Sequence, residues 1–187
     1  MRKDDILHIF AKTALLTSNR LLLRKMKRTD APDMYDYAKS LQVTRYLLWH
    51  PHPDLAYTKR YLAYVESGYR AGRFFDFAIV CRENDRMIGT CGFTRFDFPN
   101  NAAEIGYVLH PAYWNCGLAT EAVETLLRYG FDTLGLHRME ARYMLDNLAS
   151  RRVMEKCGMQ FEGVQRGLML IKDRYEDIGI FAKIKEN

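Results

Sequence analysis

The chain has few of the features that mark a metal ribbon, a redox dithiol, a secreted disulfide scaffold or a membrane protein. Its four cysteines include no Cys-x-x-Cys pair, so neither a zinc ribbon nor a dithiol motif is indicated. His50 and His52 form a His-x-His without a visible third ligand, and no metal site is predicted. No apolar run approaches the ~18 residues of a membrane span, and acids follow the first basic residues, unlike in a signal peptide. We expect reduced thiols, no membrane partner and a cytoplasmic location.

Dense positive charge is also missing, although the net charge is +5. The most basic stretch, residues 20–28, mixes Arg and Lys with Leu and Met and is typical of a strand at a sheet edge. A mild basic excess equally suits an enzyme for an anionic cofactor. We therefore expect no nucleic-acid partner, and a basic nucleic-acid-binding module stays open as an alternative.

The order of the predicted elements indicates one α/β (α+β) domain over residues 19–187, after an N-terminal extension of residues 1–18. Periodicity predicts a strand, two helices, three strands, a helix, a strand, a helix and two strands. Strands joined by short turns predict an antiparallel meander. We expect a mixed, mostly antiparallel sheet of about seven strands with helices on both faces. The extension is expected to form a short helix with Leu15 on its apolar side, and the helix after Asp30 is expected to bury Leu41.

A strand, a short loop and a helix start form the most informative stretch. Residues 104–109 alternate as a strand, Pro111 ends it, and helical periodicity begins at Leu118. The loop 115–117 has little bulk, so backbone N–H groups can converge at the helix N-terminus, a ready site for a phosphate. The alternative is an ordinary glycine turn. The spacing matches neither the P-loop nor the Gly-x-Gly-x-x-Gly fingerprint.

Residues 113–122 resemble the coenzyme A pyrophosphate loop of the GNAT acetyltransferases, Gln/Arg-x-x-Gly-x-Gly/Ala, and most of all its RimJ/RimL branch. Gly117 and Ala119 match the pattern, whereas Trp114 stands where many members carry Gln or Arg. The resemblance implies that the cofactor contacts the loop and helix start and the backbone of the preceding strand. The implied residues are Tyr107, Val108, Leu109, Asn115, Cys116, Gly117, Leu118, Ala119 and Thr120.

Residues 146–159 resemble the second GNAT signature. Asn147, Ser150 and Gly158 fit it, and Met154 occupies the position where many members have a proton-donating tyrosine. The resemblance implies that Asn147 holds the pantetheine arm or a water and that Ser150 protonates the leaving thiolate. Capping is the alternative for both, with Asn147 as N-cap and Ser150 one turn into the helix.

The general base is expected at Glu104, in the central strand and opposite in direction to Ile105 and Tyr107. A carboxylate there could take the ammonium proton, through a water, and burial would favour a pKa near working pH. The alternative is an ion pair on the face of the strand.

An unusually aromatic region, residues 46–65, indicates a wall of the acceptor pocket. Tyr46, Trp49 and Tyr61 are the substrate-binding candidates, and simple core packing is the alternative for each.

Together these patterns predict an acetyl-CoA-dependent N-acetyltransferase. The acceptor would be a primary amine, either a protein N-terminus or a small molecule, which attacks acetyl-CoA directly in a ternary complex. Acetyl-CoA acts as co-substrate, no metal is needed, and the protein is a monomer or a homodimer. A CoA-binding sensor without catalysis is the alternative from another class.

Overall fold

The computed structural model describes residues 3–13 and 15–186. Its strands are β1 (Leu15–Thr17), β2 (Leu21–Arg24), β3 (Phe75–Cys81), β4 (Arg86–Asp97), β5 (Ala102–Leu109), β6 (Arg138–Met144), β7 (Gln160–Ile171) and β8 (Arg174–Ile184). Its α-helices are α1 (Lys3–Lys12), α2 (Ala31–Ala38), α3 (Leu41–Thr44), α4 (Leu55–Arg70), α5 (Leu118–Arg128) and α6 (Leu148–Lys156). Two 3₁₀ turns, η1 (Arg28–Asp30) and η2 (Pro111–Tyr113), and a π-helical turn, η3 (Tyr129–Thr133), complete the described elements.

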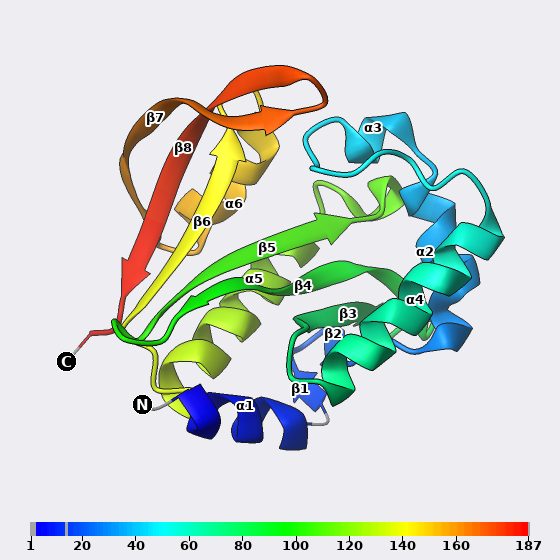
Figure 1. The fold of residues 1–187 in the computed structure, drawn as a ribbon, viewed down its shortest axis with the longest axis horizontal. Coiled ribbons are helices and arrows are strands. Elements are labelled where there is room, and N and C mark those ends of the chain that lie inside the picture. The colour runs from blue at the N-terminus through cyan, green and yellow to red at the C-terminus, as the bar shows by residue number, and fades with distance from the viewer. Residues whose placement is uncertain (1–2, 14, 187) are drawn as a thin grey trace.

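The described strands form one open sheet in the order β1-β2-β3-β4-β5-β6-β8-β7 (Figure 1). Neighbouring strands are antiparallel except for β5 and β6, which run parallel. The predicted mixed, mostly antiparallel sheet is therefore confirmed. The expected count of about seven strands is one short of the eight described strands, because β1 lies within the segment that was predicted as an extension.

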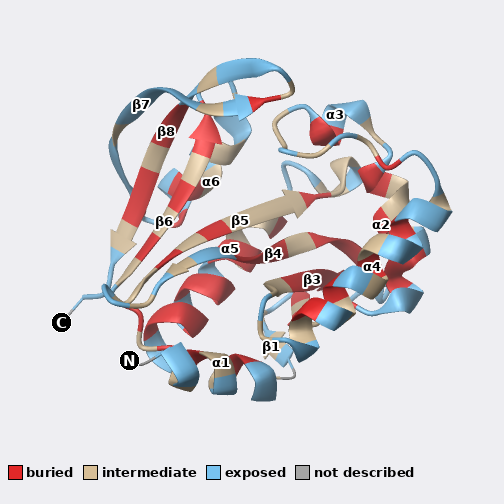
Figure 2. Ribbon diagram, in the orientation of Figure 1, coloured by how far each residue is buried: buried red, intermediate tan, exposed pale blue. Residues whose placement is uncertain are grey.

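Helices cover both faces of the sheet, and each layer has its own apolar core (Figure 2). On one face, α1 and α5 pack against β2–β5, with Ile6 and Phe10 of α1 fully buried or nearly so. On the other face, α2 and α4 pack against β3 and β4 around Tyr37 and Leu62. None of the described helices combines the length and apolar character that a bilayer crossing requires.

Two predicted core residues lie elsewhere. Leu15 belongs to β1 rather than to the N-terminal helix, which ends at Lys12, and its side chain is exposed. Leu41 is 78% exposed, because α2 ends at Ala38 and the extended backbone of Ser40 redirects the chain into α3. The predicted burial of both leucines is therefore wrong.

Candidate active site

The strands β5 and β6 diverge along their length. They pair only from Ala102 and Arg138 to Ile105 and Ala141, and beyond that point β5 has no neighbour on this side while it stays paired with β4 (Figure 1). The predicted contact segment, residues 107–109, lies in this unpaired half. Its last carbonyl, that of Leu109, already accepts a hydrogen bond of 2.7 Å from the indole Nε1 of Trp114. The opening therefore leaves backbone of residues 106–108 facing the space between the strands.

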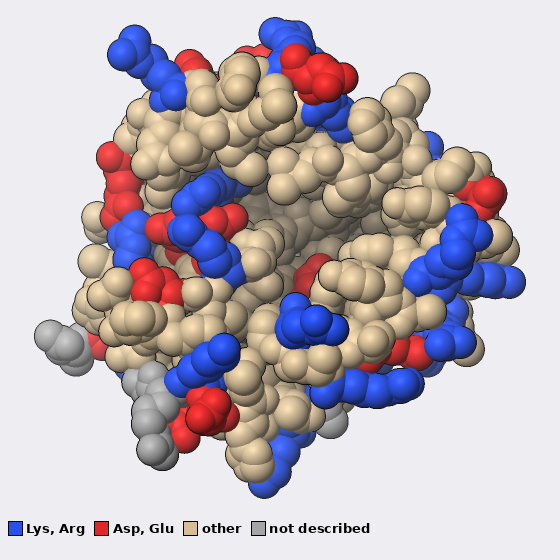
Figure 3. Space-filling view, in the orientation of Figure 1, with Lys and Arg blue, Asp and Glu red and all other residues tan. Residues whose placement is uncertain are grey.

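A cavity of about 770 Å³ opens beside this split, and Figure 3 shows it as a hollow with mostly uncharged walls. It lies between the sheet, the helices α2 and α4, and the start of α6. Most of the predicted site residues line it together: Tyr46, Trp49, Tyr61, Glu104, Tyr107, Val108, Asn147 and Ser150. Leu109, the last residue of β5, and residues 115–120, which follow the strand, are not part of its wall.

The loop before α5 has the geometry of an anion site. Gly117 is the N-cap residue with φ +76°, a left-handed conformation that glycine adopts without strain. Among the described residues, the backbone N–H groups of Leu118, Ala119 and Thr120 donate to no acceptor. Three donors at the positive end of the α5 dipole thus remain available to an anion.

The structure adds a cation that the loop sequence lacks. Arg20, which directly precedes β2, donates from Nη1 to the carbonyl of Cys116 at 2.9 Å and pairs through Nε with Glu121 of α5 at 2.7 Å. A Cβ built on Gly117 would lie 3.5 Å from Nη2 of Arg20. No local pattern could reveal this contact, because almost a hundred residues separate Arg20 from the loop.

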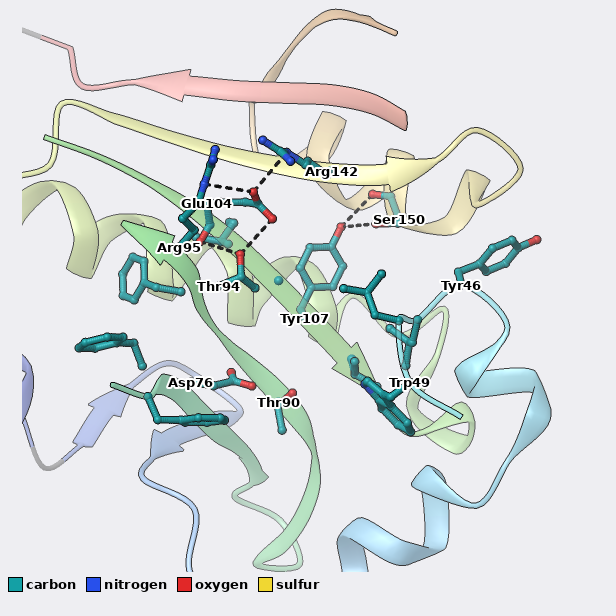
Figure 4. Close-up of a pocket in the computed structure, with 18 of the residues that line it drawn as sticks. Tyr46, Trp49, Asp76, Thr90, Thr94, Arg95, Glu104, Tyr107, Arg142 and Ser150 are labelled. Carbon is teal, nitrogen blue, oxygen red and sulfur yellow. Dashed lines mark hydrogen bonds and ion pairs between the residues drawn. The ribbon is translucent and has the colours of Figure 1, made fainter. Parts of the chain in front are cut away.

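Ser150 contacts Tyr107 at the start of α6, and Asn147 caps this helix. The Oδ1 atom of Asn147 accepts a hydrogen bond of 3.2 Å from the backbone N–H of Ser150, so Asn147 acts as the N-cap. The Ser150 hydroxyl lies 2.8 Å from the Tyr107 hydroxyl, which also donates to the Ser150 carbonyl at 3.0 Å (Figure 4). Burial raises the pKa of Tyr107, which keeps this phenol protonated. Met154 is buried in the core and plays no part in this cluster.

Glu104 is held by three neighbours (Figure 4). The Thr94 hydroxyl donates to its Oε1 at 3.0 Å, and its Oε2 lies 3.2 Å from Nε of Arg142 and 3.8 Å from Nε of Arg95. The Nε atom of Arg142 is buried and makes no hydrogen bond of good geometry within the described residues. The ion pair that was left open as an alternative is thus present, and the role of Glu104 as a base stays a prediction.

The aromatic wall carries no metal-binding cluster in the part of the chain that the structure describes. The Nδ1 atom of His52 lies 2.9 Å from the Thr58 hydroxyl, and its ring packs against those of Trp49, Tyr57 and Tyr61. Burial lowers the pKa of His52, so the ring is neutral at pH 7. The histidine is thus a neutral part of the aromatic wall.

Sequence reasoning missed one carboxylate, that of Asp76 on β3. It lies in the cavity wall next to Thr90 of β4, and both side chains point toward the interior (Figure 4). Burial raises the pKa of the Asp76 carboxyl to about 7, against the opposing effect of hydrogen bonds from the Thr90 hydroxyl and the Phe77 N–H. An acidic residue in an otherwise apolar strand, Phe-Phe-Asp-Phe-Ala-Ile-Val, was the signal that could have found it.

The acetyltransferase (GNAT) domain model matches residues 20–160 of this chain. The chain belongs to the GNAT acetyltransferases. It is therefore an acyltransferase that uses acetyl-CoA, and the predicted family is confirmed. It is 35% identical over 170 residues to an uncharacterized N-acetyltransferase, p20, of Bacillus licheniformis, an alignment that spans 91% of this chain and 96% of the relative.

Two further comparisons agree with this family. A ribosomal-protein-serine acetyltransferase of Escherichia coli is 28% identical over 102 residues, 54% of this chain and 57% of that protein. A crystal structure of a GNAT-family acetyltransferase from Bacillus anthracis superposes with a TM-score of 0.82 and 28% identity, covering 92% of this chain and 99% of the other. The comparisons thus extend to ribosomal-protein acetyltransferases, as the resemblance to the RimJ/RimL branch predicted.

Proposed function

We propose that this GNAT enzyme transfers the acetyl group of acetyl-CoA to a primary amine by direct attack in a ternary complex. The observation that carries the proposal is the arrangement along β5. Its unpaired half faces the cavity, with Tyr107 reaching Ser150 on the far wall, and the chain then leads to the open N–H groups of α5. One strand therefore links an anion site to a cavity with room for an acceptor.

Each part of the cofactor has a matching group in this arrangement. The N–H groups of Leu118, Ala119 and Thr120 would bind the diphosphate. The backbone of Tyr107 and Val108 would pair with pantetheine amides and polarise the thioester carbonyl. Residues 115–117 would shape the turn, whereas the carbonyl of Leu109 is engaged by Trp114 and serves to fix the loop.

The reacting end has a proton donor and an acceptor wall. The Ser150 hydroxyl would protonate the departing thiolate, with Tyr107 holding it in place and Asn147 fixing the start of α6. Tyr46, Trp49 and Tyr61 would contact the acceptor. We propose further that residues 19–187 are the acetyltransferase domain and that α1 and β1 complete its core.

The acceptor would be a small amine or a protein N-terminus. The enzyme would act in the cytoplasm, as a monomer or a homodimer.

A calorimetric titration with CoA, followed by thiol release from acetyl-CoA over a panel of amines, tests the proposal. The panel holds aromatic amines, polyamines, free amino acids and peptides with free N-termini. We expect one CoA per chain and thiol release that depends on the amine. A protein that binds CoA but releases no thiol with any amine is a sensor rather than an enzyme, and a protein that does not bind CoA contradicts the whole assignment.

The Arg20→Gln variant should bind CoA about threefold to tenfold more weakly, because it removes a cation beside the α5 N-terminus. The effect is moderate, since Glu121 already offsets part of the charge. Calorimetry measures the affinity. Arg28→Gln, an exposed arginine that pairs with Glu66, is the control for net charge. Equal losses in both variants would mean that only long-range charge matters.

A further inference from the structure

Asp76 and Gly106, which both line the cavity, belong to one cross-strand row of the sheet. Asp76 of β3 is the direct cross-strand partner of Gly92 of β4, and Gly92 is the partner of Gly106 of β5. Gly106 is the first residue beyond the last pair between β5 and β6. The row leads from Asp76 to the point where β5 and β6 separate, and the Thr94 methyl group lies over Gly106, 3.0 Å from a Cβ built there.

The carboxylate of Asp76 leans along this row. A Cβ built on Gly92 would clash with the Asp76 Cα and lie 2.6 Å from both the Asp76 Oδ1 atom and the Phe75 carbonyl oxygen, so the β3 backbone and the carboxylate together fill the space above Gly92. Because neighbouring strands lie ~4.8 Å apart, the Oδ1 atom is about one strand spacing from Gly106. A ligand nitrogen at a hydrogen-bonding distance of ~2.8 Å from Oδ1 would therefore lie over the row, next to the unpaired half of β5.

The surroundings of Asp76 offer it no charged partner. Within the described residues it forms no salt bridge, unlike Glu104 at the other end of the cavity, which is paired with Arg95 and Arg142. The tyrosines that face Asp76, Tyr37 from α2 and Tyr61 and Tyr69 from α4, are neutral at pH 7, because burial raises the pKa of each. The cations Lys3 and Arg73 line the same cavity but form no salt bridge with Asp76 within the described residues.

The walls near Asp76 are aromatic. Phe75 and Phe96 meet edge to face at 5.0 Å, and Phe74 packs against Tyr69, whose hydroxyl donates to the Asp76 carbonyl at 2.6 Å. An unpaired carboxylate surrounded by aromatic rings can bind a ligand that carries a cation on an apolar or aromatic group. The carboxylate and the ring faces both attract the positive charge.

We propose that Asp76 binds the acceptor as its ammonium over the Gly92–Gly106 row and removes its proton, which makes it the general base. The acceptor class is a primary amine on an apolar or aromatic body. This inference rests on the proposed acetyltransferase function and replaces Glu104 in the role of base.

The Asp76 carboxylate takes one proton from R–NH₃⁺ and leaves R–NH₂ and a carboxylic acid. The nitrogen lone pair attacks the thioester carbon, the C–S bond breaks, and the thiolate takes up the second proton that the nitrogen loses, by way of Ser150. The products are the N-acetyl amine and CoA-SH, and Asp76 returns its proton to solvent.

The test is the pH profile of thiol release with acetyl-CoA and 2-phenylethylamine as the acceptor. In the wild type we expect kcat/KM to rise with pH through an inflection near 7, the pKa of the Asp76 carboxyl. Asp76→Asn should lower kcat/KM for the amine at least 100-fold and abolish that inflection, while CoA affinity is unchanged. Asp132→Asn, an exposed residue outside the cavity, is the matched control and should behave as the wild type.

Two more variants separate a base from a merely structural residue. Thr90→Val removes a hydrogen bond that lowers the pKa of Asp76, so the inflection should move to higher pH. Glu104→Gln should keep the inflection. The inference is overturned if Asp76→Asn stays within threefold of the wild type, or if the inflection disappears with Glu104→Gln instead. Thiol release with spermidine but not with 2-phenylethylamine contradicts the acceptor class, and none with any amine contradicts the proposed function itself.

Discussion

Ser150→Ala is expected to lower the turnover number about 100-fold while CoA affinity stays within threefold of the wild type. The hydroxyl is held 2.8 Å from the Tyr107 hydroxyl at the cavity wall, where the thiolate would leave. A positioned acid contributes roughly 10²–10⁴-fold to such a step. Steady-state thiol release at saturating amine, together with calorimetry of CoA binding, measures both quantities.

Alanine at position 150 separates catalysis from capping. The cap of α6 uses the backbone N–H of Ser150, which alanine retains, so the melting temperature should change little. Ser67→Ala, the same replacement at an exposed site of α4, is the control and should leave turnover unchanged. Turnover of Ser150→Ala within threefold of the wild type would remove Ser150 as the proton donor, and a large loss of CoA affinity would show that its role is to shape the cofactor site.

Asp76→Asn is expected to be more stable than the wild type at pH 8, by a few kcal/mol. The folded-state pKa of this carboxyl is raised to about 7, from ~3.9 in an unfolded chain. The folded protein therefore binds the proton more tightly than the unfolded chain does. Wild-type stability falls as pH rises from about 4 to about 7, and the loss is complete above that range. Asparagine has no such penalty, and its amide oxygen can still accept from the Phe77 N–H.

Urea unfolding of both proteins at pH 4.5 and pH 8 measures this difference. The two stabilities should be similar at pH 4.5 and should diverge at pH 8, with the variant higher. Asp132→Asn, at an exposed site, should follow the wild type at both values. A variant that is equally stable or less stable at pH 8 would show that the Asp76 carboxylate is well solvated in the folded protein. A protein that gains stability and loses activity at one residue indicates that the residue is kept for function.

The sequence predicted those parts of the fold whose signal is local. The alternation of residues 104–109, the helix from Leu118 and the cap at Asn147 all appear at the expected positions. Each depends on neighbours within a few positions along the chain, so periodicity and capping chemistry suffice. The prediction that Leu41 is buried was wrong for a related reason. The helical spacing of apolar residues continues to Leu41 in the sequence, but α2 ends at Ala38.

The parts that escaped prediction depend on strand order and register. Arg20 reaches the α5 N-terminus only because β2 joins the same sheet as β4 and β5, and α5 packs across all three of these strands. Asp76 pairs with Gly92, and Gly92 with Gly106, only in the register that β3, β4 and β5 adopt. Arg142, one residue past the last β5–β6 pair, meets Glu104 only because the two strands pair up to that point. Sequence spacing carries no information on such contacts between distant segments.

The two carboxylates of the cavity illustrate the consequence. Glu104 was the obvious candidate from the sequence, since it lies in the strand next to the cofactor loop. In the structure Glu104 forms ion pairs with two arginines and accepts a hydrogen bond from a threonine hydroxyl. Asp76 accepts hydrogen bonds but forms no ion pair within the described residues. A general base needs a carboxyl group whose pKa is near working pH. Desolvation without a neighbouring cation raises the pKa of a carboxyl group toward that range.

The central claim is that backbone N–H groups at the start of α5 bind the diphosphate of CoA, and one titration tests it most directly. Ala119→Pro removes a single N–H in the first helical turn, where proline is tolerated, and Ala119→Ser keeps it. Calorimetry with CoA should show the proline variant at least tenfold weaker than the wild type, with the serine variant equal to the wild type. Equal affinities in all three proteins would contradict the account.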